Sequence, residues 1–254
     1  TSLGEKFDVL REACAKLKVN ERIVDWHASV WHLAHETIYL TSTGGRVRQK
    51  LSLVAPSLEA TANEGSDTQG RSLGSLRGTC RQGGLEVLED CGFYASSRRL
   101  AQEALELLDA ENCPTGCMDV LLASDQMMLQ IHESIGHPLE LDRILGDERN
   151  YAGTSFVKPE MFGAYRYGSD LLNVTFDPTR PDQFASYGYD DDGLAATKEF
   201  VIKDGILMRG LGGVTSQARS GLPGVADSRA CSWNRPPIDR MANLNVEPGG
   251  STFD

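Results

Sequence analysis

Pro138 separates two parts of this sequence that differ in their residue patterns. Before Pro138, helix-like and strand-like patterns follow one another, whereas after it Pro and Gly become frequent and the apolar runs become short. Short runs between turn residues are typical of antiparallel β structure. The sequence therefore predicts an α+β fold, with an N-terminal α/β portion of antiparallel strands and helices over residues 1–138. Residues 139–254 are expected to begin a mainly antiparallel β domain that this chain leaves incomplete, or truncated.

Three helices are predicted in the first portion. Apolar residues spaced three and four apart predict a helix over residues 5–19. A second helix is expected to begin near Ser97 and a third at Ser124, because a serine hydroxyl can cap the first turn of a helix. The third helix reaches Pro138, which lacks the amide hydrogen that helix continuation requires.

Strands and loops are predicted between these helices and after them. β-Branched and aromatic residues over 22–62 predict strands, with a hairpin turn at 43–45. Residues 64–84 are dense in Gly, Ser and Arg and predict a mobile loop. The apolar run at 118–123 predicts a buried strand, and the Asp-Gly pair at 204–205 predicts a second hairpin turn.

The composition narrows the classes of function. The chain has 254 residues with a formal net charge of -11, so it should not attract nucleic acid or an anionic membrane surface. No apolar stretch approaches the ~20 residues that span a bilayer. Its 6 Cys are too sparse for a disulfide scaffold. The first residues also lack the pattern of a signal peptide, so we expect a cytoplasmic protein.

The pattern with the most chemical content is H-E-x-x-x-H, formed by His132, Glu133 and His137. Two imidazoles are good ligands for zinc, and a carboxylate beside the first can take a proton from water at the metal. On a regular helix, however, residues five positions apart point about 140° away from each other. That angle is too wide for the two rings to share one ion.

Neighbouring residues predict a local change in the helix that would bring the two rings together. Pro138 cannot donate a hydrogen bond to the carbonyl of Ser134, and Gly136 loosens the same turn. A one-residue widening of the π type would bring both rings to one side of the helix. The spacing alone leaves a second interpretation open, in which these are two ordinary histidines at a fraying helix end.

Two other groups of residues do not support a site. His27, His32 and His35 suggest a second metal site, but strand alternation places His32 and His35 on opposite faces. The acidic run at 190–192 resembles the start of a calcium loop but lacks the rest of the twelve-residue pattern. We therefore expect that run to form a solvated turn.

Four blocks of the sequence together resemble one family. They are HESIGHPLELDR at 132–143, GTSFV at 153–157, DDDG at 190–193 and RPPIDRMAN at 235–243. In order and spacing they resemble the TldD/PmbA family of zinc metalloproteases, some of which were first named modulators of DNA gyrase. The intact H-E-x-x-x-H block resembles the catalytic, TldD-like members of that family.

The resemblance implies a zinc-dependent peptidase that hydrolyses flexible or unfolded peptides. By position, His132 and His137 would be zinc ligands, and Glu133 would be the general base on zinc-bound water. Glu140 would hold a ligand ring in place. The resemblance also implies a hetero- or homodimer with a related TldD/PmbA subunit, without direct contact to nucleic acid or membrane. The alternative is a non-catalytic peptide-binding or regulatory subunit, but the intact motif favours an enzyme.

The same resemblance predicts that this chain is an internal fragment. Family chains are nearly twice as long, and the part beyond the equivalent of Asp254 carries the cysteine that serves as third ligand. Cys231 is not expected to replace it, because Cys231 precedes the block at 235–243 whereas the family's cysteine follows that block. The fragment alone is expected to carry little zinc and to have no peptidase activity.

Overall fold

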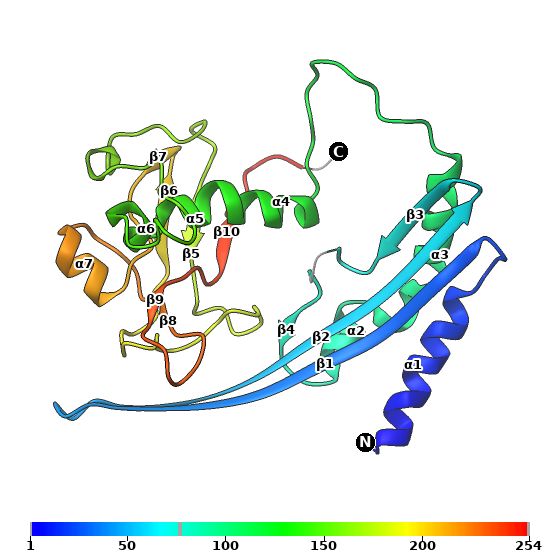
Figure 1. Cartoon of the computed structure of the whole chain (residues 1–254), viewed down its shortest axis with the longest axis horizontal. Helices are drawn as coiled ribbons and strands as arrows, with labels where there is room; N and C mark the ends of the chain where they lie inside the picture. Colours follow the sequence, from blue (N-terminus) through cyan, green and yellow to red (C-terminus); the bar gives the residue numbers. More distant parts are fainter. Residues whose placement is uncertain (1, 76–77, 253–254) are drawn as a thin grey trace. The chain divides into compact units, whose positions relative to one another are not determined.

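The computed structural model describes residues 2–75 and 78–252. The chain forms two compact units, one from the chain up to Ala34 together with Ser52–Met128, and one from His35–Leu51 together with the chain from Leu129 onward. Helices and antiparallel strand pairs occur along the chain, which confirms the α+β fold class (Figure 1). Each unit has its own apolar core.

The first unit packs helices on a sheet. Helix α3 contacts strand β3, and helix α1 contacts α3. In the sheet, β2 lies between β1 and β3 and also pairs with the short β4. The distal parts of β1 and β2 continue into the second unit. The elements are α1 (Leu3–Leu17), β1 (Ile23–Leu40), β2 (Arg46–Glu64), β3 (Asp67–Ser72), β4 (Arg81–Gln82), α2 (Glu86–Asp90) and α3 (Phe93–Asp109).

Local sequence determines where the first helix begins. The hydroxyl of Ser2 accepts a hydrogen bond from the N–H of Glu5 at 3.3 Å, and the Glu5 carboxylate accepts one from the N–H of Ser2 at 2.6 Å. This reciprocal capping box satisfies amides that the first turn leaves without helical partners. At the other end, Leu17 is fully buried in the core of the unit, so the helix is fixed at both ends.

Two predictions for the first unit are wrong in detail. Residues 64–84 are not simply a loop, because β3 pairs antiparallel with β2 in a continuous register from Glu59↔Ser72 to Glu64↔Asp67. The backbone hydrogen bonds of this ladder outweigh the low strand preference of its polar residues. The second helix begins at Phe93, and Ser97 is buried inside it instead of capping it.

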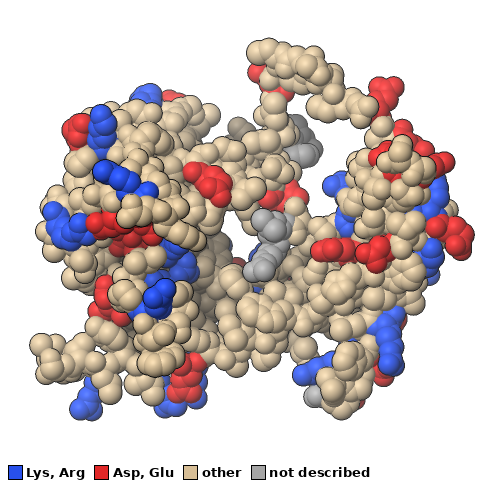
Figure 2. Space-filling view, viewed as in Figure 1, with Lys and Arg blue, Asp and Glu red and all other residues tan. Residues whose placement is uncertain are grey.

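The apolar run at 118–123 is also not a buried strand. Val120 is 71% exposed and Leu121 is 82% exposed, and the run forms no strand in the described part of the chain. It lies in the segment between α3 and α4, which is mostly tan in the space-filling view (Figure 2). A run that is apolar on both faces becomes a buried strand only when neighbouring strands pair with it and other layers cover it.

The second unit is built around a small antiparallel sheet with strand order β10-β5-β6-β7 and a separate pair, β8-β9. Its core contains the fully buried Val174, Phe176, Ile202 and Leu207 from this sheet. Helix α4 (Ser124–Ile131) begins in the first unit and ends in the second. The elements that follow it are η1 (His132–Gly136), α5 (His137–Leu139), α6 (Leu141–Leu145), η2 (Pro159–Met161), β5 (Val174–Phe176), β6 (Glu199–Lys203), β7 (Ile206–Leu207), α7 (Val214–Ser220), β8 (Ser228–Arg229), β9 (Ile238–Asp239) and β10 (Leu244–Val246).

The predicted turn at 204–205 is confirmed. Asp204 and Gly205 have φ values of 49° and 75° between β6 and β7. Two successive residues with positive φ form the turn whose twist matches that of the flanking antiparallel strands. The carbonyl of Gly205 also accepts a hydrogen bond from the N–H of Tyr167 at 2.7 Å, so this turn positions a neighbouring segment.

Among the helices that the structure describes, none has the length and apolar character required to span a bilayer.

Gly205→Ala should lower the free energy of unfolding by about 3 kcal/mol. A methyl group there would meet the carbonyl oxygens of Ser169 and Gly168, the second at 2.5 Å, in addition to the cost of positive φ. Gly221→Ala is the matched control, because Gly221 also has positive φ but no atom within 4 Å of the added methyl group. The control should lose only about 1 kcal/mol. Equal losses in urea denaturation would contradict the assigned contact.

Candidate metal centre

The candidate ligands lie where α4 passes into a π-helical turn. Helix α4 ends at Ile131, η1 covers His132–Gly136, and α5 follows directly. The N–H of His137 donates to the carbonyl of His132, five residues earlier instead of the usual four. The predicted widening of π type is therefore confirmed.

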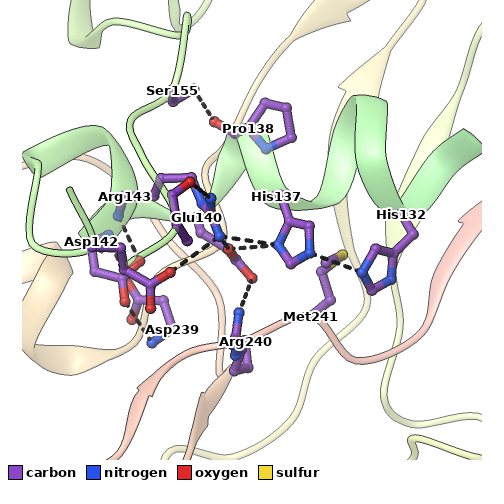
Figure 3. Close-up of polar contacts among 12 residues, drawn as sticks. His132, His137, Pro138, Glu140, Asp142, Arg143, Ser155, Asp239, Arg240 and Met241 are labelled. Atoms are coloured by element: carbon purple, nitrogen blue, oxygen red, sulfur yellow. Dashed lines mark hydrogen bonds and ion pairs between the residues drawn. The ribbon is translucent and has the colours of Figure 1, made fainter. Parts of the chain in front are cut away.

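This turn brings two imidazole rings together. Nε2 of His132 and Nε2 of His137 are 2.9 Å apart, and the ring planes are 88° apart (Figure 3). Two nitrogens that bind one tetrahedral zinc ion at ~2.0–2.1 Å would lie ~3.3 Å from each other. The pair needs to open by only a few tenths of an ångström to accept such an ion, so the two side chains fit a shared metal.

A carboxylate completes the group. One oxygen of Glu133 lies 3.9 Å from Nε2 of His132, and the ligand atoms of His132, Glu133 and His137 all lie within 4.8 Å of one another. In the described part of the chain, this is the one set of His, Cys, Asp and Glu side chains with spacing suited to a metal. The Glu133 side chain is 60% exposed, so its carboxylate is accessible from solvent.

Glu140 contacts Nδ1 of His137, the ring nitrogen that does not face His132. Its side chain is completely buried, and its Oε2 atom lies 2.9 Å from Nδ1 of His137. Arg143 donates to the same oxygen through Nε at 3.3 Å and Nη2 at 3.2 Å. On the other side, Nη1 of Arg240 lies 3.6 Å from Oε1. Two guanidinium groups therefore compensate the buried carboxylate.

These contacts determine the proton position on His137. A carboxylate is an acceptor and a guanidinium is a donor, and the carboxylate of Glu140 is the nearer neighbour of Nδ1. We therefore assign the proton to Nδ1, which leaves the lone pair of Nε2 directed at His132. Arg143 is anchored in turn by the carbonyl of Ala152 at 2.7 Å and by Glu148 at 3.1 Å.

His132 is also biased toward its neutral form. Partial burial lowers its pKa, and the neighbouring His137 lowers the pKa further. Glu133 and Glu140 act in the opposite direction, but they do not reverse the shift. A neutral imidazole is the form that binds a metal, so the environment favours ligation.

Packing restrains the turn from two directions. A side chain on Gly136 would overlap Sδ of Met241, so the glycine leaves the space into which Met241 packs. The hydroxyl of Ser155 donates to the carbonyl of Pro138 at 2.6 Å (Figure 3). The role of Gly136 is thus to permit a close contact, since its own φ and ψ are helical at -57° and -69°.

A pair of buried aspartates fixes the next helix. The N–H of Asp142 donates to Oδ2 of Asp239 at 2.9 Å, and the N–H of Asp239 donates to Oδ2 of Asp142 at 3.3 Å. Oδ1 of Asp239 also accepts from the N–H of Gly213 at 3.0 Å. These bonds join the start of α6 to β9 beside the candidate site.

The weaker candidates do not gather around a metal. The ring of His32 contacts Ser52, and the ring of His35 contacts Thr37. The expected solvated turn at 190–192 is wrong for Asp190, which is buried. Its carboxylate accepts hydrogen bonds from the N–H groups of Asp192, Leu194 and Ser228, so it organises the local backbone.

The sequence predicted the two histidines, Glu133 and Glu140 as candidate site residues but did not predict the side chains that contact them. Arg143 could have been found, because it stands three residues after Glu140, a spacing that places opposite charges together on a helix. Arg240 and Met241 were recognised only as part of a sequence block. Tyr167, which contacts the π turn, carried no signal, since it lies 33 residues from the carbonyl that it meets.

This geometry is that of a group of side chains suited to a metal ion. Residues 1–108 match the model of the PmbA/TldA metallopeptidase central domain, and residues 115–254 match that of the PmbA/TldA metallopeptidase C-terminal domain. The chain therefore belongs to the PmbA/TldA metallopeptidase family, which confirms the resemblance to TldD and PmbA proteins.

Individual relatives agree with this assignment. A metalloprotease of Methanothermobacter thermautotrophicus is 29% identical over 252 residues, covering 99% of this chain and 52% of that protein. A zinc metalloprotease TldD homolog of Saccharolobus solfataricus is 26% identical over 157 residues, covering 61% of this chain and 33% of that protein. The chain thus spans about half the length, 52%, of the Methanothermobacter thermautotrophicus protein.

A solved structure shares the fold. The crystal structure of a putative modulator of a DNA gyrase from Thermotoga maritima has a TM-score of 0.75 with 18% sequence identity. The match covers 100% of this chain and 54% of that chain. At this identity the similarity concerns the fold alone.

The buried Asp142 should make stability decrease as the pH rises. Burial raises its pKa to about 7, with a further contribution from Asp239, so the folded chain keeps a proton that the unfolded chain releases near pH 4. The stability from this proton is complete below pH ~4 and is lost as the pH passes about 7, by at most about 1.4 kcal/mol per pH unit.

Urea denaturation at pH 5 and pH 8 measures this effect. Asp142→Asn should lose less stability between the two pH values than the unmodified chain does, because the amide does not titrate. Asp170→Asn, at an exposed position, is the control and should behave like the unmodified chain. An unchanged pH dependence in Asp142→Asn would show that this carboxyl does not titrate in that range.

Proposed function

We propose that this chain carries the catalytic metal site of a zinc-dependent peptidase that hydrolyses flexible or unfolded peptides. The observation that carries the proposal is the π turn, in which Nε2 of His132 and Nε2 of His137 lie 2.9 Å apart with Glu133 beside them. A regular helix through the same residues would direct the rings about 140° apart and would remove this support.

Zinc is the metal that this donor set favours. Imidazole nitrogens bind zinc well, and catalytic zinc sites combine them with one further protein ligand. Glu140 on Nδ1 of His137 is the arrangement that orients a ligand ring and raises its basicity. The name of the Saccharolobus solfataricus relative, a zinc metalloprotease, also supports this choice of metal.

Each residue then has a separate task. Zinc, when bound, would polarise the scissile carbonyl and make the attacking water more acidic. His132 and His137 hold the ion through Nε2, and Glu140 fixes the orientation of the His137 ring. Glu133 is the general base, whose exposed carboxylate takes a proton from the attacking water and passes it to the leaving amine.

The third ligand is proposed to lie outside this chain. Catalytic zinc sites generally have three protein ligands, and the two imidazoles here supply two. Cys113, Cys117 and Cys231 are exposed free thiols that do not belong to the metal-binding group in the described residues. The relatives contain about as many residues again as this chain covers, which leaves room for the missing ligand.

A related TldD/PmbA subunit is the proposed partner, as a hetero- or homodimer. The cytoplasm is the proposed compartment, because 6 Cys in 254 residues are sparse for the disulfide scaffold of an exported protein. The second candidate function is a non-catalytic peptide-binding or regulatory subunit, and the presence of Glu133 between two convergent imidazoles favours the enzyme.

Glu133→Gln should separate metal binding from catalysis. In the protein with the complete reading frame, this variant should keep its zinc content and lose about 10²–10⁴-fold in turnover of an unstructured peptide. His137→Ala should lose both the zinc and the activity. Metal analysis and peptide hydrolysis measure the two effects. Near-normal turnover in Glu133→Gln would remove Glu133 from the role of general base.

Residues 1–254 alone should carry little zinc at neutral pH and show no peptidase activity. Two imidazoles without a third ligand hold the ion weakly, and adding the rest of the reading frame should restore both properties. Cys231→Ser is the informative variant, and it should leave the zinc content of the fragment unchanged. Stoichiometric zinc that disappears on this substitution would identify Cys231 as a ligand.

A further inference from the structure

The carbonyl of Ser134 in the π turn lacks the backbone donor that a regular helix would provide. In a regular helix, the carbonyl of Ser134 accepts from the N–H four residues later, which is the position of Pro138. Pro138 has no N–H, so this bond cannot form. The residue is half-buried, and a polar backbone group that is partly withdrawn from water needs another donor.

Tyr167 supplies a donor. Its hydroxyl donates to the carbonyl of Ser134 at 2.5 Å, across 33 residues of sequence. Burial raises the pKa of Tyr167 to about 12, so the hydroxyl keeps its proton and stays a donor throughout the neutral range. A side chain that inserts into the ladder of a helix in this way can stabilise an irregular turn.

The sheet of the second unit fixes the position of Tyr167. Its N–H donates to the carbonyl of Gly205 at 2.7 Å, inside the turn between β6 and β7. The preceding Arg166 forms a bridge with Ile206, and the N–H of Leu207 donates to the carbonyl of Tyr165 at 3.0 Å. The backbone of the tyrosine is thus an extension of the sheet and not part of a free loop.

Aromatic packing fixes the direction of the ring. The centroid of Tyr167 lies 5.8 Å from that of Tyr165 and 5.9 Å from that of Phe156. Such pairs restrict the side chain to one orientation and contribute beyond their buried area. The hydroxyl therefore reaches the turn from a residue that is held by contacts at both its backbone and its ring.

We propose that Tyr167 is a positioning residue for the metal centre, which holds the π turn open through its hydrogen bond to Ser134 and so keeps His132 and His137 facing each other. Glu140 orients one ring, whereas Tyr167 sets the spacing between the two rings. The part of this inference that concerns metal affinity rests on the proposed function, and the part that concerns the turn does not.

The test compares Tyr167→Phe with Tyr165→Phe in the protein with the complete reading frame. Both variants remove one hydroxyl from neighbouring rings of the same cluster, and only the first removes the donor to Ser134. Hydrogen exchange of the His137 amide, which donates to the carbonyl of His132, reports the turn in the metal-free protein. It should become about tenfold faster in Tyr167→Phe and stay unchanged in Tyr165→Phe.

Metal affinity provides the second readout. The Kd for zinc, measured by chelator competition, should rise about 10–100-fold in Tyr167→Phe, the range typical for loss of a residue that supports a ligand. The visible spectrum of the cobalt-substituted protein should shift as well, because it reports ligand geometry. A loss of general stability alone would move the unfolding midpoint without changing that spectrum.

The possible outcomes separate the inference from the proposed function. If the His137 amide exchanges equally in Tyr167→Phe and the unmodified protein, Tyr167 does not hold the turn and the inference is overturned. If exchange accelerates but zinc affinity and the cobalt spectrum stay unchanged, the positioning role is overturned. If His137→Ala leaves zinc binding intact, the proposed metal site is wrong, while the exchange measurement still decides the role of Tyr167 in the turn.

Discussion

The candidate site depends on one helical hydrogen bond that the backbone cannot make. An α-helix repeats every 3.6 residues, so side chains five positions apart diverge unless one residue is absorbed by a wider turn. Pro138 removes the amide that would keep the regular pattern, and the backbone instead joins His137 to His132. The convergence of the two imidazoles is therefore a property of the backbone, and the side chains around it serve to keep that irregular turn in one conformation.

Predictions from the sequence succeeded where the determining residues are close together. The histidine spacing and Pro138 predicted the π turn, and the Asp-Gly pair at 204–205 predicted the hairpin. They failed where distant segments decide the structure. The polar residues at 67–72 become a strand only because β2 offers a ladder, and the apolar run at 118–123 lacks strand partners in the described residues. No local pattern could show that Met241 fills the space above Gly136.

Several ionisable side chains are buried near the histidines, and most of them have a counter-charge or hydrogen-bond partners. Glu140 has Arg143 and Arg240 as counter-charges, and the Asp142–Asp239 pair accepts backbone N–H groups. Asp227 differs, because it is fully buried and its carboxylate oxygens have no hydrogen-bond partner in the described structure. Burial raises its pKa well above the ordinary value, which favours the neutral acid. Such an interior tolerates few substitutions, since removing one charge leaves another uncompensated.

The exposed run at 118–123 has a consequence for how this chain behaves in solution. Val120 and Leu121 present apolar side chains to water in a segment whose backbone forms no strand ladder in the described structure. An exposed apolar segment without strand partners can pair with another chain. This segment therefore favours self-association, which the net charge of -11 opposes most strongly at low ionic strength.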